Sequence, residues 1–328
     1  MRAIGVKAFG GPEVLEVLSL EPGAPAAGQV RVKVGFAGVN SIDVHVRRGA
    51  FLGRERRPPG WPLVLGYEGA GTVESVGPNV AGVRAGDRVA WCGLSGACAE
   101  LAIVPAWRLV LVPDAVPLDI ACALQLDGAM AHALSVSVFP IKAGDRVLVQ
   151  GAADSLALML IRIAKAQGAE VIATIVREVE AGGPKAAGAD HIVVMDGRDV
   201  AAEVREATRG EGCHVVYDGL GRDSFATSLA CCRRRGVIVL HGGNSHPVET
   251  VRPDDLAAAG SVYVTRPHLA DFLQDANEVM WRMDAVLGAW SAGRLEIGVG
   301  RVLPLEGARE AHLALEGQTP AGKILLRP

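Results

Sequence analysis

A strand, a turn and a helix in the middle of the sequence have the arrangement with which dinucleotide-binding sites begin. Residues 147–165 read VLVQGAADSLALMLIRIAK, which is an apolar run of strand length, a short turn and an amphipathic stretch of helix length. In such a turn, glycines usually let backbone N–H groups approach a pyrophosphate. Here Gly151 and Ala152 are followed by Asp154 and Ser155. The segment therefore predicts a dinucleotide fold with an unusual turn.

Asp154 stands where this helix is expected to begin. A carboxylate there is a favourable N-cap, because it accepts the same N–H groups and meets the same helix dipole that a phosphate would. If a diphosphate bound about 4 Å away, repulsion at an effective dielectric constant near 20 would cost on the order of 4 kcal/mol per charge pair before relaxation. That corresponds to roughly a thousandfold in affinity. We therefore expect Asp154 to occupy the anion site.

The composition is that of a globular protein with room for two domains. The 328 residues are 50% hydrophobic and 21% charged. With 33 basic and 36 acidic residues the net charge is -3, which gives no electrostatic reason to expect nucleic acid or an anionic membrane as a partner. The expected partner is a small-molecule substrate.

The cysteines and the apolar runs indicate the compartment. The six cysteines include no CxxC pair and no histidine neighbour at zinc-finger spacing, so reduced, mostly buried thiols are expected. The first residues, MRAIGVKAFGG, lack the features of a signal peptide, and the most apolar run, 156–161, is too short to span a bilayer. These features predict a cytoplasmic location and no membrane association.

Two kinds of pattern divide the chain. Short alternating runs at 30–39, 69–77, 86–93 and 99–113 predict a compact antiparallel β domain in the first third. From about residue 118, apolar strands alternate with helix-length segments, which predicts βαβ units and a doubly wound parallel sheet.

The C-terminal tail is too small to form a domain of its own. After Pro267 the sequence predicts a helix over roughly 271–293, followed by two short strands. We expect this tail to return and complete the first domain.

This organisation and two motifs resemble the medium-chain dehydrogenase/reductase superfamily. AGVNSIDVHVRRGAF at 37–51 resembles its GxNxxDxxxRxGxY segment, and residues 66–89 resemble its GxExxGxVxxVGxxVxxxxxGDRV segment. The chain looks most similar to the zinc-independent quinone oxidoreductases. That resemblance is carried by 130–149, 164–174, 186–191, 215–221 and 264–267.

The resemblance covers nearly the whole chain and implies an α/β fold class. It predicts a GroES-like β-rich catalytic domain formed by residues 1–120 and 267–328. A Rossmann-type doubly wound parallel sheet domain, residues 121–266, is inserted between them. It also implies a homodimer formed through an edge strand near 237–243 and 261–267.

No metal is expected. The alcohol dehydrogenases of the superfamily have Cys and His zinc ligands where this chain has Asn40 and Tyr67, which are poor zinc ligands. The four-cysteine lobe that would follow residues 86–89 is also missing.

The positions that bind the NADPH phosphates in the family depart from its pattern. The glycine pair of its AAxGGVG turn falls on Asp154 and Ser155, and the next glycine falls on Ala157. Its 2′-phosphate clamp of Ser, Lys and Tyr corresponds to a hydrophobic residue, an acid and a thioether. These are Val176, Glu180 and Met195.

The nicotinamide end differs as well, since the Thr of the family's QGxTAH segment is replaced by Met130. From these three departures we expect NADPH binding to be weak or lost, so that no cofactor is expected. The alternative is that the chain holds NADPH through other backbone contacts. Any residual site would use Gly151, Ala152, Asp154, Ser155, Ala157 and the cations Arg177 and Lys323.

Several polar residues stand at positions that line the interdomain cleft in the family. His45 replaces an aromatic residue, Asp127 replaces a Gln, and the segment usually written FGNASGP contains His241 and His246. Histidine and carboxylate side chains suit general acid–base work. Two further side chains, Tyr67 and Asn40, could hold an enolate-like oxygen.

Three functions are compatible with these residues. The leading hypothesis is a non-redox acid–base enzyme that performs cyclisation, isomerisation or elimination on a quinone- or polyketide-like metabolite. The second is an NADPH-dependent quinone or enone reductase. The third is an inactive binding or scaffold protein.

Overall fold

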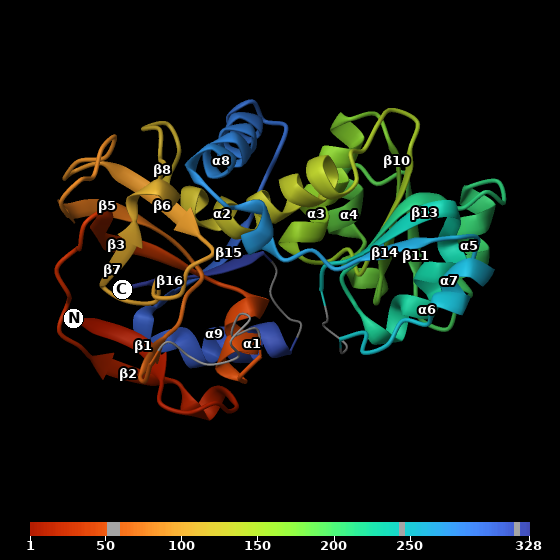
Figure 1. Ribbon diagram of the computed structural model, residues 1–328. Helices are drawn as coiled ribbons and strands as arrows, with labels where there is room; N and C mark the ends of the chain where they lie inside the picture. The colour runs from red at the N-terminus through yellow and green to blue at the C-terminus, as the bar shows by residue number, and fades with distance from the viewer. Residues whose placement is uncertain (51–59, 243–246, 318–321) are drawn as a thin grey trace. The chain divides into compact units, whose positions relative to one another are not determined.

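The computed structural model describes residues 1–50, 60–242, 247–317 and 322–328, which form two compact units (Figure 1). The first unit comprises Met1–Ala129, Leu273–Ser291 and Ile297–Pro328, and the second comprises Met130–Phe272 and Ala292–Glu296. The chain enters the second unit inside helix α2, Leu118–His132, whereas the sequence placed this passage at residue 120.

The first unit is built on two sheets. One has the order β2-β1-β4, and the other has the order β15-β16-β3-β5-β6-β8, with β7 paired to β3. The strands are β1 Arg2–Val6, β2 Glu16–Ser19, β3 Gln29–Val39, β4 Leu63–Val64, β5 Glu68–Val76, β6 Arg88–Cys92, β7 Leu101–Pro105, β8 Val110–Leu111, β15 Val299–Pro304 and β16 Lys323–Arg327. The helices are α1 Ser41–Arg47, α8 Ala276–Ser291 and α9 Ala308–Glu316.

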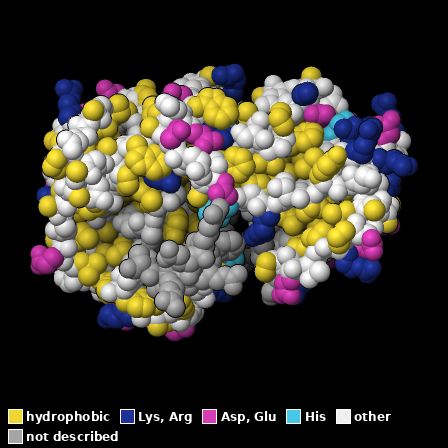
Figure 2. Space-filling model, in the orientation of Figure 1, with side chains coloured by type: hydrophobic (Ala, Val, Ile, Leu, Met, Phe, Trp, Pro, Cys, Tyr) yellow, Lys and Arg dark blue, Asp and Glu magenta, His cyan; other side chains and the backbone are white. Residues whose placement is uncertain are grey.

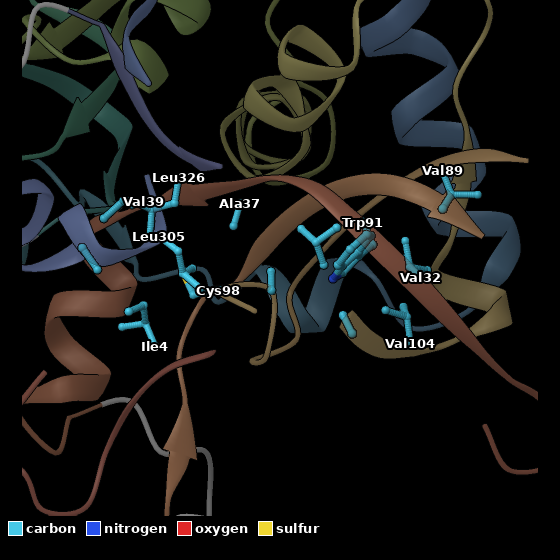
Figure 3. Close-up of a cluster of buried hydrophobic side chains, with 14 of the residues drawn as sticks. Ile4, Val32, Ala37, Val39, Val89, Trp91, Cys98, Val104, Leu305 and Leu326 are labelled. Atoms are coloured by element: carbon cyan, nitrogen blue, oxygen red, sulfur yellow. The ribbon is translucent and has the colours of Figure 1, made fainter. Parts of the chain in front are cut away.

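The alternating sequence of β3 produces the core of this unit. Val30, Val32 and Val34 are buried, and the residues between them are not. Because successive side chains of a strand point to opposite faces, one face of β3 packs inward. Figure 3 shows this cluster, in which Ile4, Trp91 and Leu326 come from widely separated parts of the chain.

Most of the C-terminal tail, Leu273–Ser291 and Ile297–Pro328, belongs to the first unit. Strand β16 pairs antiparallel with β3, with Ile324 opposite Val39, and β15 pairs parallel with β16. Leu305 and Leu326 belong to the same buried cluster as Val32.

The second unit is a doubly wound parallel sheet. Its strand order is β11-β10-β9-β12-β13-β14, and every neighbouring pair is parallel. The strands are β9 Arg146–Gln150, β10 Glu170–Ile175, β11 His191–Val194, β12 Cys213–Asp218, β13 Cys232–Leu240 and β14 Tyr263–Thr265. The helices are α3 Ser155–Ala166, α4 Gly182–Ala187, α5 Val200–Ala207, α6 Arg222–Cys231 and α7 Pro253–Ala258.

The central strand β9 shows why the strands of this sheet have continuous apolar sequences. Val147, Leu148 and Val149 are all fully buried, on both faces of the strand. Parallel sheets of this kind carry helices on both faces, so alternation with polar residues is not needed. The predicted fold class, a β-rich unit with an inserted Rossmann-type sheet, is confirmed.

Candidate cofactor and active sites

The strand order of the second unit defines where a dinucleotide would bind. The chain runs from β9 to β10 and β11 on one side, and from β12 to β13 and β14 on the other. In open α/β sheets, ligands bind outside the carboxyl ends of the strands at the point where the order reverses. That point lies between β9 and β12, which are followed by the turns 151–154 and 219–221.

These two turns are built on glycine and pack against each other. Gly151 has φ 71° and Gly221 has φ 104°, conformations that L side chains rarely adopt. A Cβ added to Gly151 would lie 2.7 Å from the side chain of Leu220. Close backbone approach at the carboxyl ends of β9 and β12 is what a dinucleotide site requires.

A buried carboxylate holds the turn after β12. Asp218 is fully buried, and its Oδ1 accepts the N–H groups of Leu220 and Gly221, each at 3.0 Å. Its Oδ2 accepts the hydroxyl of Ser228 at 2.6 Å. The buried carboxylate of Asp218 therefore fixes the conformation of this turn.

The same network reaches the turn after β9. The amide of Gln150 donates to the Ser228 hydroxyl at 2.7 Å, and its Oε1 accepts from Thr174 at 3.3 Å. The Thr174 hydroxyl oxygen in turn accepts the Gly151 N–H at 3.1 Å. Both turns are thus fixed by one chain of hydrogen bonds across β10, β9 and β12.

Asp154 caps helix α3, as the sequence predicted. Its backbone is extended, with φ −92°, and its Oδ1 accepts the Ala157 N–H at 2.8 Å. Ser155 is the first residue of the helix, and Ala152 is buried at the end of the turn. A carboxylate therefore stands at the helix end that faces the expected phosphate position.

The backbone of the second unit fits a dinucleotide. A Cβ added to Gly242, which follows β13, would lie 1.9 Å from the Gly219 carbonyl oxygen. Together with the positive φ of Gly151, this shows that glycines at the ends of β9, β12 and β13 allow the backbone to pack closely there. The frame that holds a dinucleotide is therefore present, with an acidic side chain added at Asp154.

Four polar side chains of the first unit form a cluster around one ammonium group. Lys323 Nζ donates to Asn40 Oδ1 at 2.6 Å and to Asp127 Oδ2 at 2.9 Å, and it lies 3.0 Å from Glu68 Oε2. The amide of Asn40 also donates to Glu68 Oε2 at 2.9 Å. The structure thus brings together two predicted catalytic residues, Asn40 and Asp127, around a lysine that the sequence assigned to the cofactor.

Charge balance explains why this lysine is tolerated in the interior. Burial lowers the pKa of Lys323, but the carboxylates of Asp127 and Glu68 outweigh that effect and raise it above its usual value. Burial also raises the pKa of Glu68, against the lowering effect of Lys323. Because an ammonium has three N–H donors and three oxygens surround it, Lys323 is saturated within the first unit.

Sequence reasoning missed Glu68. Its side chain is fully buried, and its Oε1 also accepts the Leu126 N–H at 2.8 Å. The signal was present in the sequence as an acid in an otherwise apolar stretch, GYEGAG, that begins at residue 66. A buried acid of this kind needs a partner, and that partner is the distant Lys323.

Tyr67 and Asp43 lie beside the cluster. Asp43 is buried, and it accepts the N–H groups of Asn40 at 2.9 Å and Gly66 at 3.0 Å. Burial, and then the charge of Asp43, raise the pKa of the Tyr67 hydroxyl. Tyr67 therefore keeps its proton at neutral pH and can act as a donor.

The candidate histidines do not gather in one unit. His45 lies on α1 of the first unit, and His241 follows β13 of the second. Burial lowers the pKa of His241 to about 4, with a further lowering by Arg266 against the raising effect of Asp218. Its imidazole is therefore neutral at physiological pH, which does not suit a general acid. His246 lies outside the described residues.

Arg177 does not stand alone at the end of β10. Its Nε donates to Glu180 Oε1 at 2.8 Å. The cation expected to meet a phosphate is thus already paired with a carboxylate.

The part of the chain that the structure describes contains no group of three or more His, Cys, Asp or Glu side chains placed to hold a metal ion. No helix in that part is long and apolar enough to cross a membrane. In the face drawn in Figure 2, side chains of both charges and hydrophobic side chains occur on each unit.

Comparison with known proteins defines the class. Two family models match, one described as an alcohol dehydrogenase GroES-like domain over residues 26–114 and one as a zinc-binding dehydrogenase over residues 155–282. The first match lies within the β-rich unit, and the second covers most of the parallel-sheet unit and extends into α8 of the first unit. Fold and site therefore define a dehydrogenase/reductase of the medium-chain type.

Individual relatives narrow this class. The chain is 34% identical to a quinone oxidoreductase of Pseudomonas aeruginosa over 100% of this chain and 99% of the relative. It is 34% identical to a 2-haloacrylate reductase of a Burkholderia species over 97% of this chain and 96% of the relative. The crystal structure of the Escherichia coli quinone oxidoreductase complexed with NADPH has a TM-score of 0.95 and 32% identity, with 100% of both chains covered. The chain belongs to the quinone oxidoreductase family of the medium-chain dehydrogenase/reductase superfamily.

These comparisons overturn the leading hypothesis from the sequence. Full-length relatives are reductases, and one of them was crystallised with NADPH. The expectation that the cofactor is lost, and that the protein performs non-redox acid–base chemistry, is therefore wrong. The physical reason is that the glycine turns after β9 and β12, which shape the backbone of such a site, are kept although the side chains around them differ.

Proposed function

We propose that this protein transfers a hydride from a reduced nicotinamide dinucleotide to a quinone or an enone. The E. coli relative was crystallised with NADPH, and the Burkholderia relative is named as a reductase of 2-haloacrylate, an activated alkene. The observation that carries the proposal is the likeness to the NADPH complex over the whole chain, with a TM-score of 0.95.

The second unit would hold the dinucleotide at the carboxyl edge of its sheet. The glycines of the turns at 151–154 and 219–221 would let a pyrophosphate approach the backbone there, and Asp218 holds the second turn through the N–H groups of Leu220 and Gly221. Helix α3 contributes its N-terminus, shared with the carboxylate of Asp154. When bound, the dinucleotide supplies the hydride.

The first unit would bind the substrate oxygen. Tyr67 keeps its proton because its pKa is raised, so its hydroxyl can donate to a quinone or enone carbonyl. Lys323 stays charged because of Asp127 and Glu68, and it adds a fixed positive charge beside Asn40. Solvent supplies the proton that completes the reduction.

A titration followed by turnover measurements tests the proposal. Purified protein is titrated calorimetrically with NADPH and with NADH, and the loss of reduced dinucleotide is then followed with a panel of quinones, enones and 2-haloacrylate. Micromolar binding, with oxidation that depends on one of these acceptors, is expected. No binding of either dinucleotide up to about millimolar concentration, equivalent to less than about 4 kcal/mol of binding free energy, would contradict it.

A further inference from the structure

The carboxyl end of β10 is the place where a fold of this type distinguishes NADH from NADPH. In NAD-binding proteins an acidic residue after the second strand accepts a hydrogen bond from the ribose 2′-hydroxyl, whereas an arginine nearby accommodates the 2′-phosphate of NADP. In this unit the second strand is β10, and Val176, Arg177 and Glu180 follow it. Both an acid and an arginine are therefore present, and their geometry decides between the two cofactors.

A short helical turn, Glu178–Glu180, brings the side chain of Glu180 back to the end of β10. Its Oε2 accepts the N–H groups of Val176 at 3.1 Å and of Arg177 at 3.3 Å. The Glu180 side chain is only 16% exposed. A carboxylate is thus held at the backbone amides that end β10, which is where the ribose-binding acid of NAD proteins acts.

Arg177 is bound by that same carboxylate. Its Nε donates to Glu180 Oε1 at 2.8 Å, although 60% of the arginine side chain is exposed. Residues 176–181 contain this one cation and two acids, Glu178 and Glu180, so the segment is net negative. A 2′-phosphate, with a charge of about −1.5 to −2, would meet this excess of negative charge.

The other side chains of the segment offer no bond to a phosphate. Val176 is apolar and exposed. Met195, which follows β11, donates its backbone N–H to Ile175 and packs against the core of the second unit. Ribose hydroxyls are neutral donors and would be accepted by the Glu180 carboxylate, whereas the one cation of this segment, Arg177, is already bonded to that carboxylate through Nε.

We propose that this protein uses NADH in preference to NADPH, and that Glu180 makes the distinction by accepting the ribose hydroxyls and disfavouring a 2′-phosphate. The inference rests on the proposed reductase function and names which dinucleotide serves it. It differs from the NADPH that the E. coli relative was crystallised with.

The test measures affinity as well as turnover. Dissociation constants of the full-length protein are determined by calorimetry for NADH, NADPH, ADP-ribose and 2′-phospho-ADP-ribose. The unphosphorylated member of each pair should bind at least about tenfold more tightly, which is equivalent to about 1.4 kcal/mol. The ratio of kcat/KM for NADH and NADPH should change in the same direction.

Three variants separate the effect of Glu180 from that of its neighbour Glu178. Glu180→Gln removes the charge and should bring the affinity ratio close to one, and Glu180→Lys should reverse it. Glu178→Gln makes the same change of charge on an exposed side chain two residues away and should leave the ratio within about twofold, or about 0.4 kcal/mol. Thermal unfolding of each variant checks that the segment has kept its fold.

The outcomes distinguish this inference from the proposed function. Tighter binding of NADPH than of NADH, or an unchanged ratio in a folded Glu180→Gln variant, would overturn the inference and leave the reductase proposal intact. Absence of binding by all four ligands would overturn both.

Discussion

The ammonium of Lys323 lies 2.9 Å from the carboxylate of Asp127, although 196 residues separate them in the sequence. Lys323 stands on the last strand of the first unit, and Asp127 stands on α2. Two more oxygens, from Asn40 and Glu68, complete the surroundings of the ammonium. One buried cation thus ties the C-terminal strand to three earlier segments of the chain.

Replacing this lysine should strongly destabilise the first unit. Lys323→Met leaves the carboxylates of Glu68 and Asp127 without their counter-charge, and breaking a buried pair in this way typically costs about 3–5 kcal/mol. Urea unfolding, followed by circular dichroism, should show a loss of that size.

The matched control is Asp127→Asn, because it removes one carboxylate and leaves the pair between Lys323 and Glu68. The Asp127 side chain is 15% exposed, whereas that of Glu68 is fully buried. A loss of about 1 kcal/mol is expected, the contribution of a typical hydrogen bond. Equal losses in the two variants would show that the cluster does not depend on the lysine charge.

The fold was predictable because its signals are local. Apolar residues alternate along β3, whereas β9 is a continuous apolar run followed by a glycine turn and a helix, and each pattern indicates its own kind of sheet. The return of the C-terminal tail followed from its small size. These arguments needed only neighbouring residues and packing rules.

The polar cluster of the first unit was not predictable in the same way. Asn40 and Asp127 were chosen singly, and nothing in the sequence shows that both contact Lys323. The partner of a buried acid is set by the tertiary pairing of β16 with β3, which no local pattern specifies. The sequence groups Lys323 with the cations of a residual cofactor site, whereas in the structure its ammonium donates to Asn40 and Asp127 of the first unit.

The cofactor was misjudged for a related reason. The side chains of Asp154, Glu180 and Met130 depart from the family pattern, but the frame of the site consists of backbone turns. Gly151 and Gly221 have positive φ, and Asp218 holds the second turn. Substitutions around such a frame alter affinity and preference without removing the site.

Neutralising Asp154 should tighten dinucleotide binding. Asp154→Asn removes the charge but keeps a side-chain oxygen that can accept the Ala157 N–H, since Asn is as good an N-cap as Asp. Dinucleotide affinity should rise about tenfold or more, as expected when a like-charge interaction worth over about 1.4 kcal/mol is removed. Calorimetric titration of wild type and variant measures the change.

Asp154→Ala separates the effect of the N-cap hydrogen bond on stability from the effect of the negative charge on dinucleotide affinity. It also removes the carboxylate, but it leaves the helix uncapped and should lower the free energy of unfolding by about 1 kcal/mol. Asp154→Asn should stay within about 0.5 kcal/mol of wild type. If neither variant changes dinucleotide affinity, the carboxylate of Asp154 does not oppose the phosphates.

Buried His312 should make the protein sensitive to mild acid. Burial, and then the nearby charge of Arg47, lower the pKa of His312 to about 3, whereas an unfolded histidine titrates near 6.5. Because the folded pKa is the lower one, this contribution to stability is present above about pH 6.5 and is lost as the pH falls toward 3. The slope is about 1.4 kcal/mol per pH unit.

Urea unfolding at several pH values between 6 and 5 measures that slope. His312→Gln should reduce it by about 1.4 kcal/mol per pH unit relative to wild type, whatever its own effect on stability. An unchanged slope in His312→Gln would show that His312 is protonated in the folded protein.

The edge strand β14 is where we propose that two copies of this chain associate. Among the described residues it pairs with β13 alone, and it ends the sheet order of the second unit. Tyr263 on this strand is 63% exposed. An exposed edge with an aromatic side chain is a ready template for strand pairing, so we expect a homodimer with a continuous sheet.

Light scattering after size-exclusion chromatography tests this arrangement. Tyr263→Glu places a charge on the edge strand and should shift the dimer toward monomer, raising the dissociation constant at least about tenfold, or by about 1.4 kcal/mol. Val179→Glu makes a similar change at an apolar residue that is 82% exposed but lies away from the edge, and it should leave the dimer intact. A wild-type protein that is a monomer would contradict this arrangement. Equal dissociation of both variants would also contradict it, because in a sheet formed across β14 a charge on that strand should weaken the dimer more than a charge elsewhere.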